Sequence, residues 1–142
     1  MGAVMKRMLL ALAAAAALVA APAAAISQTR PEKATPALQA EFNTFIGKFR
    51  AALKAIDADA VTALTRLPFF YDNAMRDAAA FRTKVYPASF TARNRACLQR
   101  GKGVYDMDGN KNHNFFIFCG QQIFVFTKTP AGFLFTDLGV ND

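Results

Sequence analysis

The residues that could carry acid–base chemistry are few and scattered along the chain. The candidates are Tyr71, Asp72, Tyr86, His113 and Asp137. A general acid or base must reach its substrate and have a suitably shifted pKa, and no spacing among these residues is typical of a catalytic pair. Tyr86 follows Val85 near the end of an apolar helical stretch and is the best candidate to line a pocket. We therefore predict no specific catalytic residue, and a non-catalytic protein is favoured over an enzyme without excluding one.

The two cysteines, Cys97 and Cys119, predict a disulfide. An exported chain enters an oxidising compartment, where thiols do not stay reduced, so two cysteines are expected to form a disulfide. The alternative is a redox or nucleophilic cysteine, but there is no Cys-x-x-Cys motif. His113, which could activate a thiol, has no obvious orienting partner in the sequence.

A run of alternating oxygen-bearing side chains, Asp106-x-Asp108-x-Asn110, is similar to the start of a calcium-binding loop. An EF-hand loop has Gly at its sixth position and Glu at its twelfth, where this chain has Lys111 and Ile117. The Asp-Gly step within the run favours a hairpin turn instead. We expect no metal ion and no cofactor.

Basic residues dominate one segment. No acidic residue interrupts the stretch between Asp77 and Asp106, and Arg93, Arg95, Arg100 and Lys102 are candidates to face an anion. In an exported protein this would be an anionic envelope surface rather than nucleic acid. The alternative is an ordinary solvated helix surface.

The first 25 residues resemble a secretory signal peptide. Lys6 and Arg7 precede an apolar run from Met8 to Ala20, and Ala23–Ala25 offers a small-residue cleavage site. Cleavage would lower the net charge from +7 to +5. We predict residues 26–35 as a flexible leader and residues 36–142 as a single domain, with no transmembrane segment after signal removal. The location would be the periplasm or the exterior.

Helices are expected in the first half of the domain. Apolar residues recur every three or four positions from Pro36 to Ile56, after an N-cap at Thr35. Asp57 would cap a short helix that ends at Leu67, before Pro68.

Two further helices follow. Asp77 would cap a helix over 78–86 that Pro87 interrupts, and Thr91 would cap the last helix. Gly101 would end that helix in a left-handed conformation. Between these helix pairs, Phe69–Tyr71 is a brief extended candidate.

The second half predicts strands joined by turns, namely 103–107, 114–119, 123–128 and 133–140. Pairing Cys119 with Gln122 and Lys128 with Phe133 would give two apolar faces. One face would hold Phe115, Ile117, Cys119, Phe124, Phe126, Phe133 and Phe135. The other would hold Phe116, Phe118, Ile123, Val125, Leu134, Leu138 and Val140. The expected fold class is therefore α+β, with N-terminal helices packed on a curved antiparallel β-meander and one disulfide.

This layout resembles the nuclear-transport-factor-two-like (SnoaL-like) cone-fold superfamily over Pro36 to Val140. The resemblance is carried by Phe-x-x-Ala-Leu-x-x-x-Asp at Phe49–Asp57 and by the closing strand with Phe133 where a Trp is frequent. It implies a curved sheet that forms a cone-shaped pocket with its helices, and dimers built on the opposite sheet face.

Three functions remain open from the sequence. The first is an exported non-catalytic binding module whose aromatic cone holds a small apolar ligand and whose second sheet face forms a homodimer. Its predicted pocket lining is Phe42, Phe45, Phe49, Tyr86, Phe124, Phe126 and Phe135. The second is a cone-fold isomerase or hydrolase that acts on a hydrophobic small molecule. The third is a secreted inhibitor or partner-binding protein that uses its basic helical face.

Overall fold

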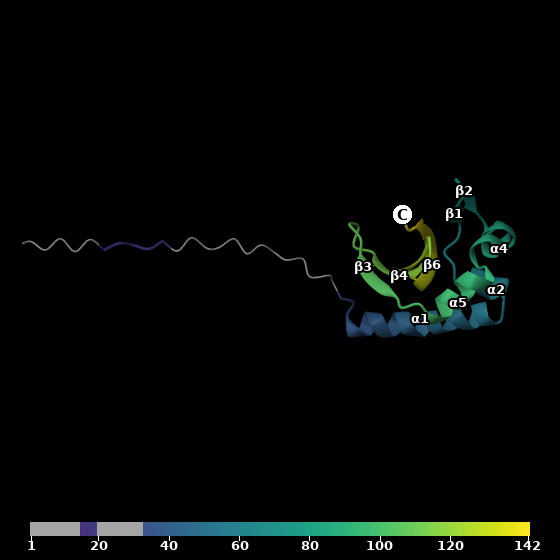
Figure 1. The fold of residues 1–142 in the computed structure, drawn as a ribbon, viewed down its shortest axis with the longest axis horizontal. Helices are drawn as coiled ribbons and strands as arrows, with labels where there is room; N and C mark the ends of the chain where they lie inside the picture. The colour runs from purple at the N-terminus through teal and green to yellow at the C-terminus, as the bar shows by residue number, and fades with distance from the viewer. Residues whose placement is uncertain (1–14, 20–32) are drawn as a thin grey trace, which may run out of the picture.

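The computed structural model of the chain describes residues 15–19 and 33–142. Most of the predicted signal peptide and most of the predicted leader lie outside these ranges, so both stay predictions. Within the described ranges, helices precede a four-stranded antiparallel sheet, which confirms the α+β class (Figure 1). None of the helices in these ranges is both long and apolar enough to cross a membrane.

Helix α1 (Pro36–Lys54) is the longest helix described and lies along the sheet (Figure 1). The Thr35 hydroxyl accepts the backbone N–H of Leu38 at 3.2 Å, which confirms the predicted N-cap. The buried positions of α1 recur at helical spacing: Phe42, Phe45, Ile46, Phe49, Ala52 and Leu53. An ion pair between Glu41 of α1 and Lys128 of the sheet adds a polar link beside this apolar stripe.

Helix α2 (Ala58–Ala63) is shorter than predicted. Asp57 caps it by accepting the Ala60 N–H at 3.0 Å, as expected. It ends at Ala63 because the next residues turn to pair with the sheet: the Phe135 N–H donates to Leu64 O and the Arg66 N–H to Phe135 O, both at 2.9 Å. This pairing covers the middle of one edge of the sheet.

Strands β1 (Phe69–Tyr71) and β2 (Ala74–Arg76) form a hairpin that projects from the helical end of the molecule (Figure 1). The sequence predicts β1 but not β2. The turn residues Asp72 and Asn73 have φ of 49° and 56°, the left-handed conformation that short polar side chains tolerate best.

The third predicted helix continues through Pro87 rather than stopping there. It consists of α3 (Ala78–Ala80), the π-helical turn η1 (Phe81–Val85) and α4 (Tyr86–Ser89). A proline ring inside a regular α-helix would clash with the carbonyl of the residue four positions earlier. The wider π turn, in which the Tyr86 N–H reaches back to Phe81 O, makes room for that ring.

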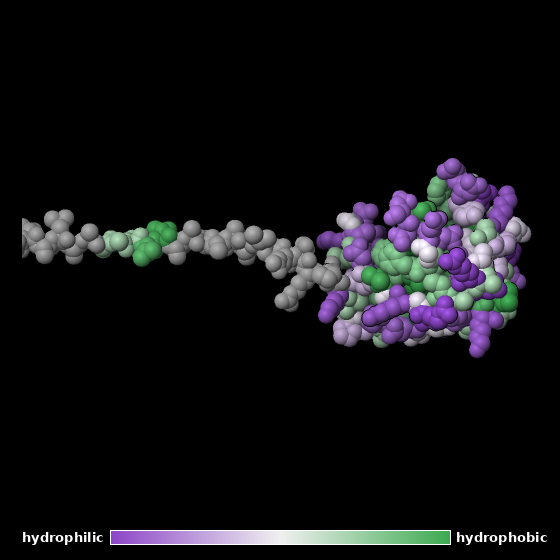
Figure 2. Space-filling view, viewed as in Figure 1, coloured by the Kyte–Doolittle hydropathy of each residue, from purple (hydrophilic) through white to green (hydrophobic). Residues whose placement is uncertain are grey.

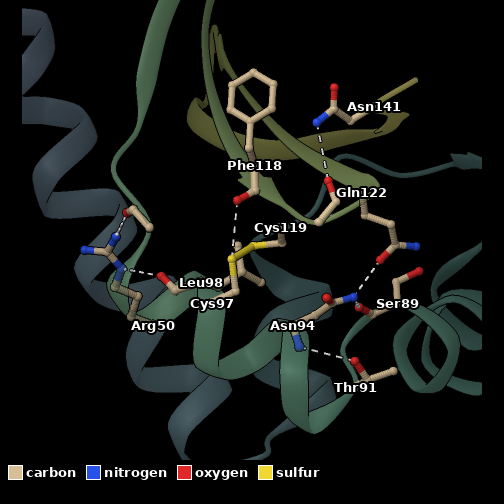
Figure 3. The surroundings of a disulfide bond; sticks show 12 residues. Arg50, Ser89, Thr91, Asn94, Cys97, Leu98, Phe118, Cys119, Gln122 and Asn141 are labelled. Atoms are coloured by element: carbon tan, nitrogen blue, oxygen red, sulfur yellow. Dashed lines mark hydrogen bonds between the residues drawn. A yellow bond between two sulfur atoms is a disulfide. The ribbon is translucent and has the colours of Figure 1, made fainter.

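Helix α5 (Ala92–Arg100) begins at the predicted Thr91 cap, but Gly101 is not left-handed. Its φ is −64°, and a Cβ there would lie 2.4 Å from Ile117 Cγ2. Glycine is therefore required by close packing of the helix end on the sheet. The Arg50 side chain donates to Leu98 O at 2.8 Å and Gly101 O at 2.6 Å, which satisfies carbonyls at this helix end (Figure 3).

The sheet is an antiparallel meander in the order β3-β4-β5-β6. Its strands are β3 (Val104–Met107), β4 (His113–Cys119), β5 (Gln122–Thr129) and β6 (Gly132–Val140). The predicted pairs Cys119–Gln122 and Lys128–Phe133 are both present. Figure 1 shows the sheet bent, with β3 and β6 at its margins.

A β-bulge at Thr136 changes the predicted faces of β6. Phe135 pairs with Phe126, yet Asp137 pairs with Val125, so one extra residue lies between them. Leu138 therefore lies opposite Phe124 and packs against the core, instead of on the second face. Val140, opposite Gln122, moves to the same face as Leu138 but is 72% exposed at the end of the strand.

The core is a nearly continuous set of aromatic rings between α1 and the sheet. Phe42 stacks on Phe115 with centroids 4.0 Å apart and planes 3° from parallel. Phe49 meets Phe126 edge-on at 5.1 Å. The disulfide Cys97–Cys119, with Cα atoms 5.8 Å apart, joins α5 to the end of β4 as predicted (Figure 3).

Candidate functional site

The face of the sheet turned away from α1 carries several partly exposed apolar side chains, and we call it the outer face. The strand register places the following residues on it: Val104, Asp106, Asn114, Phe116, Phe118, Ile123, Val125, Thr127, Leu134 and Asp137. No described helix lies between these side chains and solvent.

Apolar side chains form two neighbouring rows across the outer face. Val104, Phe116 and Val125 are directly paired in one row, and Phe118 and Ile123 are paired in the next. Phe118 is 48% exposed and Val104 is 49% exposed. At Phe118, β4 pairs only with β5, because β3 reaches no further than Phe116, and this leaves the ring accessible to solvent or to a partner.

The pictures agree with this arrangement. In Figure 3 the Phe118 ring points away from α5, while its neighbour Cys119 points toward α5 and the disulfide. In Figure 2, which looks across the layers with α1 at the bottom, hydrophobic atoms lie above α1 and hydrophilic atoms surround them. On the outer face itself, the register places Asp106 and Asn114 on one side of the apolar rows and Asp137 on the other, so this face is an apolar surface with a polar border.

The polar end of the outer face is a hydrogen-bonded ladder. The buried Thr127 hydroxyl contacts Asn114 Oδ1 at 2.7 Å and Thr136 Oγ1 at 2.7 Å. Thr136 in turn donates to Val125 O at 3.3 Å. These polar atoms satisfy one another within the fold, so they need no ligand.

Asp108 organises the loop between β3 and β4. Its carboxylate accepts the backbone N–H groups of Asn110 and Asn112, both at 2.9 Å, and the side-chain amide of Asn112 at 2.9 Å. The Asn112 amide, then its backbone N–H, lower the pKa of Asp108 below its ordinary value because they stabilise the carboxylate. The carboxylate thus ties a hairpin turn, the arrangement that the Asp-Gly step predicts. Among the described residues no cluster of three or more His, Cys, Asp or Glu could hold a metal ion.

Two carboxylates flank the apolar rows. Asp106 pairs with Asn114 at the β3 side, and Asp137 pairs with Val125 at the β6 side. Both side chains are exposed. Asp137 Oδ1 accepts the N–H of Leu138 at 2.8 Å. The sequence pattern names Asp137 only as an acid–base candidate, because the bulge that turns it outward leaves no local signal.

The seven side chains predicted to line a ligand pocket lie together in the core. They are buried and pack among the rings of the aromatic core. Phe49, Phe124, Phe126 and Phe135 are each 0% exposed, and Phe42, Phe45 and Tyr86 are also buried. Their rings fill the space between α1, α4 and the sheet. Ligand binding among them stays a prediction.

Tyr86 is the one acid–base candidate within the core. Its ring stacks on Phe90 at 5.4 Å, and its buried hydroxyl, like that of Ser89, has no hydrogen-bond partner among the described residues. The other candidates lie apart from it. Tyr71 and Asp72 are on the β1–β2 hairpin, and His113 Nδ1 contacts the Tyr105 hydroxyl at 2.6 Å. The structure does not bring any two of the five candidates together into a hydrogen-bonded pair in the region it describes.

The four predicted anion-facing residues do not converge. Arg93 borders a depression beside Gly120 and Gln122, whereas Arg95 borders another beside Leu53. Arg100 and Lys102 share a third depression of about 370 Å³ with Arg50. Binding of an anionic surface by these residues stays a prediction.

Comparison with known proteins gives no relative from which to transfer a function. No protein-family model, no curated protein sequence and no solved structure matches this chain. The cone-fold resemblance therefore stays a prediction as well, and the geometry of the outer face carries the functional inference.

Proposed function

We propose that this domain is an exported, non-catalytic binding module that acts through the outer face of its sheet. The observation that carries this proposal is the half-exposed Phe118 of β4, next to Ile123 and Phe116 on the same face, where no described helix covers the sheet. Burying a side chain of this kind is worth roughly 1.5–3 kcal/mol. An exposed apolar surface with a polar border is typical of an interaction site.

Two further features support the proposal. The Cys97–Cys119 disulfide is consistent with export, because disulfides persist in oxidising compartments. The aromatic interior is filled by its own rings, such as Phe49 and Phe135, which makes the outer face the more accessible place for a partner.

Native mass spectrometry of the protein purified from its own host tests this proposal. We expect the wild-type protein to carry a non-covalently bound species that is lost in a Phe118→Ser variant. Phe70, which is 55% exposed on the β1–β2 hairpin, provides the matched control, and Phe70→Ser should retain the species. A species that survives Phe118→Ser, or its absence from all three proteins, would contradict the proposal.

A further inference from the structure

We infer that the partner of the outer face is a cationic, partly apolar polypeptide segment, in which Lys or Arg side chains flank apolar ones. This inference rests on the proposed function and adds the chemistry of the partner. It follows from how charge is distributed over the molecule.

The charge of the outer face is opposite to that of the whole chain. The chain has a formal net charge of +7, yet the outward positions of the paired strands include Asp106 and Asp137 and no Lys or Arg. Lys128 is the one Lys or Arg in strands β3 to β6, and it points to the helical side, where it pairs with Glu41. The outer face is therefore acidic and apolar on a basic protein.

The two carboxylates lie where a bound segment would cover them. Asp137 ends the apolar row of Val104, Phe116 and Val125, and Asp106 flanks that row on β3. A carboxylate that loses water on binding needs a cation or hydrogen-bond donors in exchange, because an unpaired buried charge costs several kcal/mol. Within the described residues no cation lies within salt-bridge distance of either carboxylate. The partner has to supply the cations.

A second copy of the chain, docked through the same face, fits this requirement poorly. Such an interface is self-complementary, so it would bury Asp106 and Asp137 of both copies and no basic side chain of the sheet. Like charges brought together in an interface oppose association. A segment with Lys or Arg instead pairs the carboxylates, and the alkyl stems of those side chains cover apolar surface.

The hydrogen-bonded ladder at the end of the outer face contributes little to the recognition of a partner. The hydroxyls of Thr127 and Thr136 are already bonded to each other, so they offer little to a partner. Selectivity then comes from apolar contact with Phe118 and its row and from pairing of the two carboxylates. Both requirements have to be met in one ligand, which distinguishes it from a simple polycation or a neutral apolar peptide.

Fluorescence anisotropy of short dye-labelled peptides on the mature protein tests the inference. The probes are an alternating Leu-Lys peptide, an alternating Leu-Glu peptide of equal length, and an alternating Ser-Lys peptide that keeps the charge without the apolar groups. We expect the Leu-Lys peptide to bind at least about tenfold more tightly than either control, a difference of ~1.4 kcal/mol. Its affinity should fall as salt rises.

Variants of the protein locate the binding. Phe118→Ser and Asp137→Asn should each lower the affinity of the protein for the Leu-Lys peptide by about tenfold. The Asn variant keeps the Oδ1 acceptor for the Leu138 N–H, so it removes charge with little change in shape. Phe70→Ser and Asp72→Asn change exposed residues of the β1–β2 hairpin and should leave the affinity unchanged.

The possible failures are distinguishable. If the Leu-Glu peptide binds as tightly as the Leu-Lys peptide and depends on Phe118, the outer face is a binding site but the cationic partner is wrong. If sedimentation shows a wild-type dimer that Phe118→Ser dissociates, the face belongs to a second copy and the inference is again overturned. If the protein is a monomer and binds none of the peptides, both the inference and the proposed function are contradicted.

Discussion

Asp137 on β6 lies opposite Val125 on β5, on the face of the sheet that no described helix covers. Alternation from Phe133 and Phe135 would point Asp137 toward the aromatic core, where its unpaired carboxylate would be costly. The extra residue at Thr136 reverses the alternation. It turns the charge outward and brings Leu138 against the core in its place.

The Thr127 hydroxyl should be important for stability because it joins the two partners of the ladder. Thr127→Val keeps the shape of the side chain but leaves the buried Asn114 Oδ1 and the Thr136 hydroxyl without this contact. We expect the free energy of unfolding to fall by about 1–3 kcal/mol. Urea unfolding followed by circular dichroism measures it.

Thr44→Val is the matched control for that variant. The Thr44 hydroxyl donates to Ala40 O at 3.2 Å, but it lies on the exposed side of α1, where water replaces the bond. This variant should change the free energy of unfolding by less than about 0.5 kcal/mol. Equal effects of the two substitutions would show that the ladder has no special role.

Asp108 should make the stability of the fold depend on pH in the acidic range. Hydrogen bonds from Asn112 lower its pKa in the folded state below the ordinary value of an aspartate side chain. A lowered folded-state pKa means that the stabilisation is fully present above the unfolded-state pKa and is lost as pH falls through the folded-state pKa. The difference in the free energy of unfolding between the wild-type protein and Asp108→Asn should therefore disappear below about pH 4.

The measurement is the urea midpoint of both proteins between neutral and acidic pH. The difference between them should stay constant from neutral pH down to about pH 5 and then shrink. Asp72→Asn, at an exposed turn position, controls for general effects of removing a carboxylate. A difference that is the same at every pH would rule out titration of Asp108 as the cause.

The helix caps and strand pairing follow from local rules, and the sequence predicts them well. Thr35, Asp57, Asp77 and Thr91 each accept the N–H that a capping residue should. These contacts join residues three positions apart, so the sequence pattern contains them. The disulfide is also predicted because the two cysteines have no other pairing available.

The features that the sequence does not predict depend on contacts between distant segments. The helix through Pro87 needs a π turn that forms around a packed Phe81 and Val85. The bulge at Thr136 and the shape of the outer face depend on which residue of β5 each residue of β6 meets. The alternation of apolar residues predicts the apolar rows of the sheet. One extra residue in β6 exchanges the two faces for every residue after it, so the sequence could not predict on which face Asp137 lies.

Two glycines allow a test of close packing at the end of α5. Gly101→Ala keeps a permitted φ, yet its Cβ would lie 2.4 Å from Ile117 Cγ2, so the sheet or the helix end has to move. We expect a loss of about 1–3 kcal/mol in the free energy of unfolding. Gly47→Ala, in the exposed middle of α1 with nothing within 4 Å, should instead gain roughly 0.5–1 kcal/mol. Thermal unfolding of the two variants compares them, and a neutral Gly101→Ala would contradict the packing.

The disulfide should contribute measurably to stability. Cys97 and Cys119 are 22 residues apart, and closing a loop of this length stabilises by roughly 3 kcal/mol in the chain-entropy model. Replacing both cysteines with Ala should lower the free energy of unfolding by roughly 3 kcal/mol. Reductant should destabilise the wild-type protein and leave the double variant unchanged. If reductant has no effect on the wild-type protein, the bond does not form in solution.

The two faces of the sheet should respond differently to loss of a Phe ring. Phe135 is 0% exposed and contacts the rings of Phe49 and Phe126, so Phe135→Ala should cost about 3–5 kcal/mol by leaving a cavity. Phe118→Ala, on the outer face, should cost less than about 1 kcal/mol, because its ring is already half in water. Urea unfolding of both variants gives the comparison. A large loss of stability in Phe118→Ala, measured without any ligand, would mean that this ring stabilises the isolated domain. In that case its position on the outer face would no longer be evidence for a binding partner.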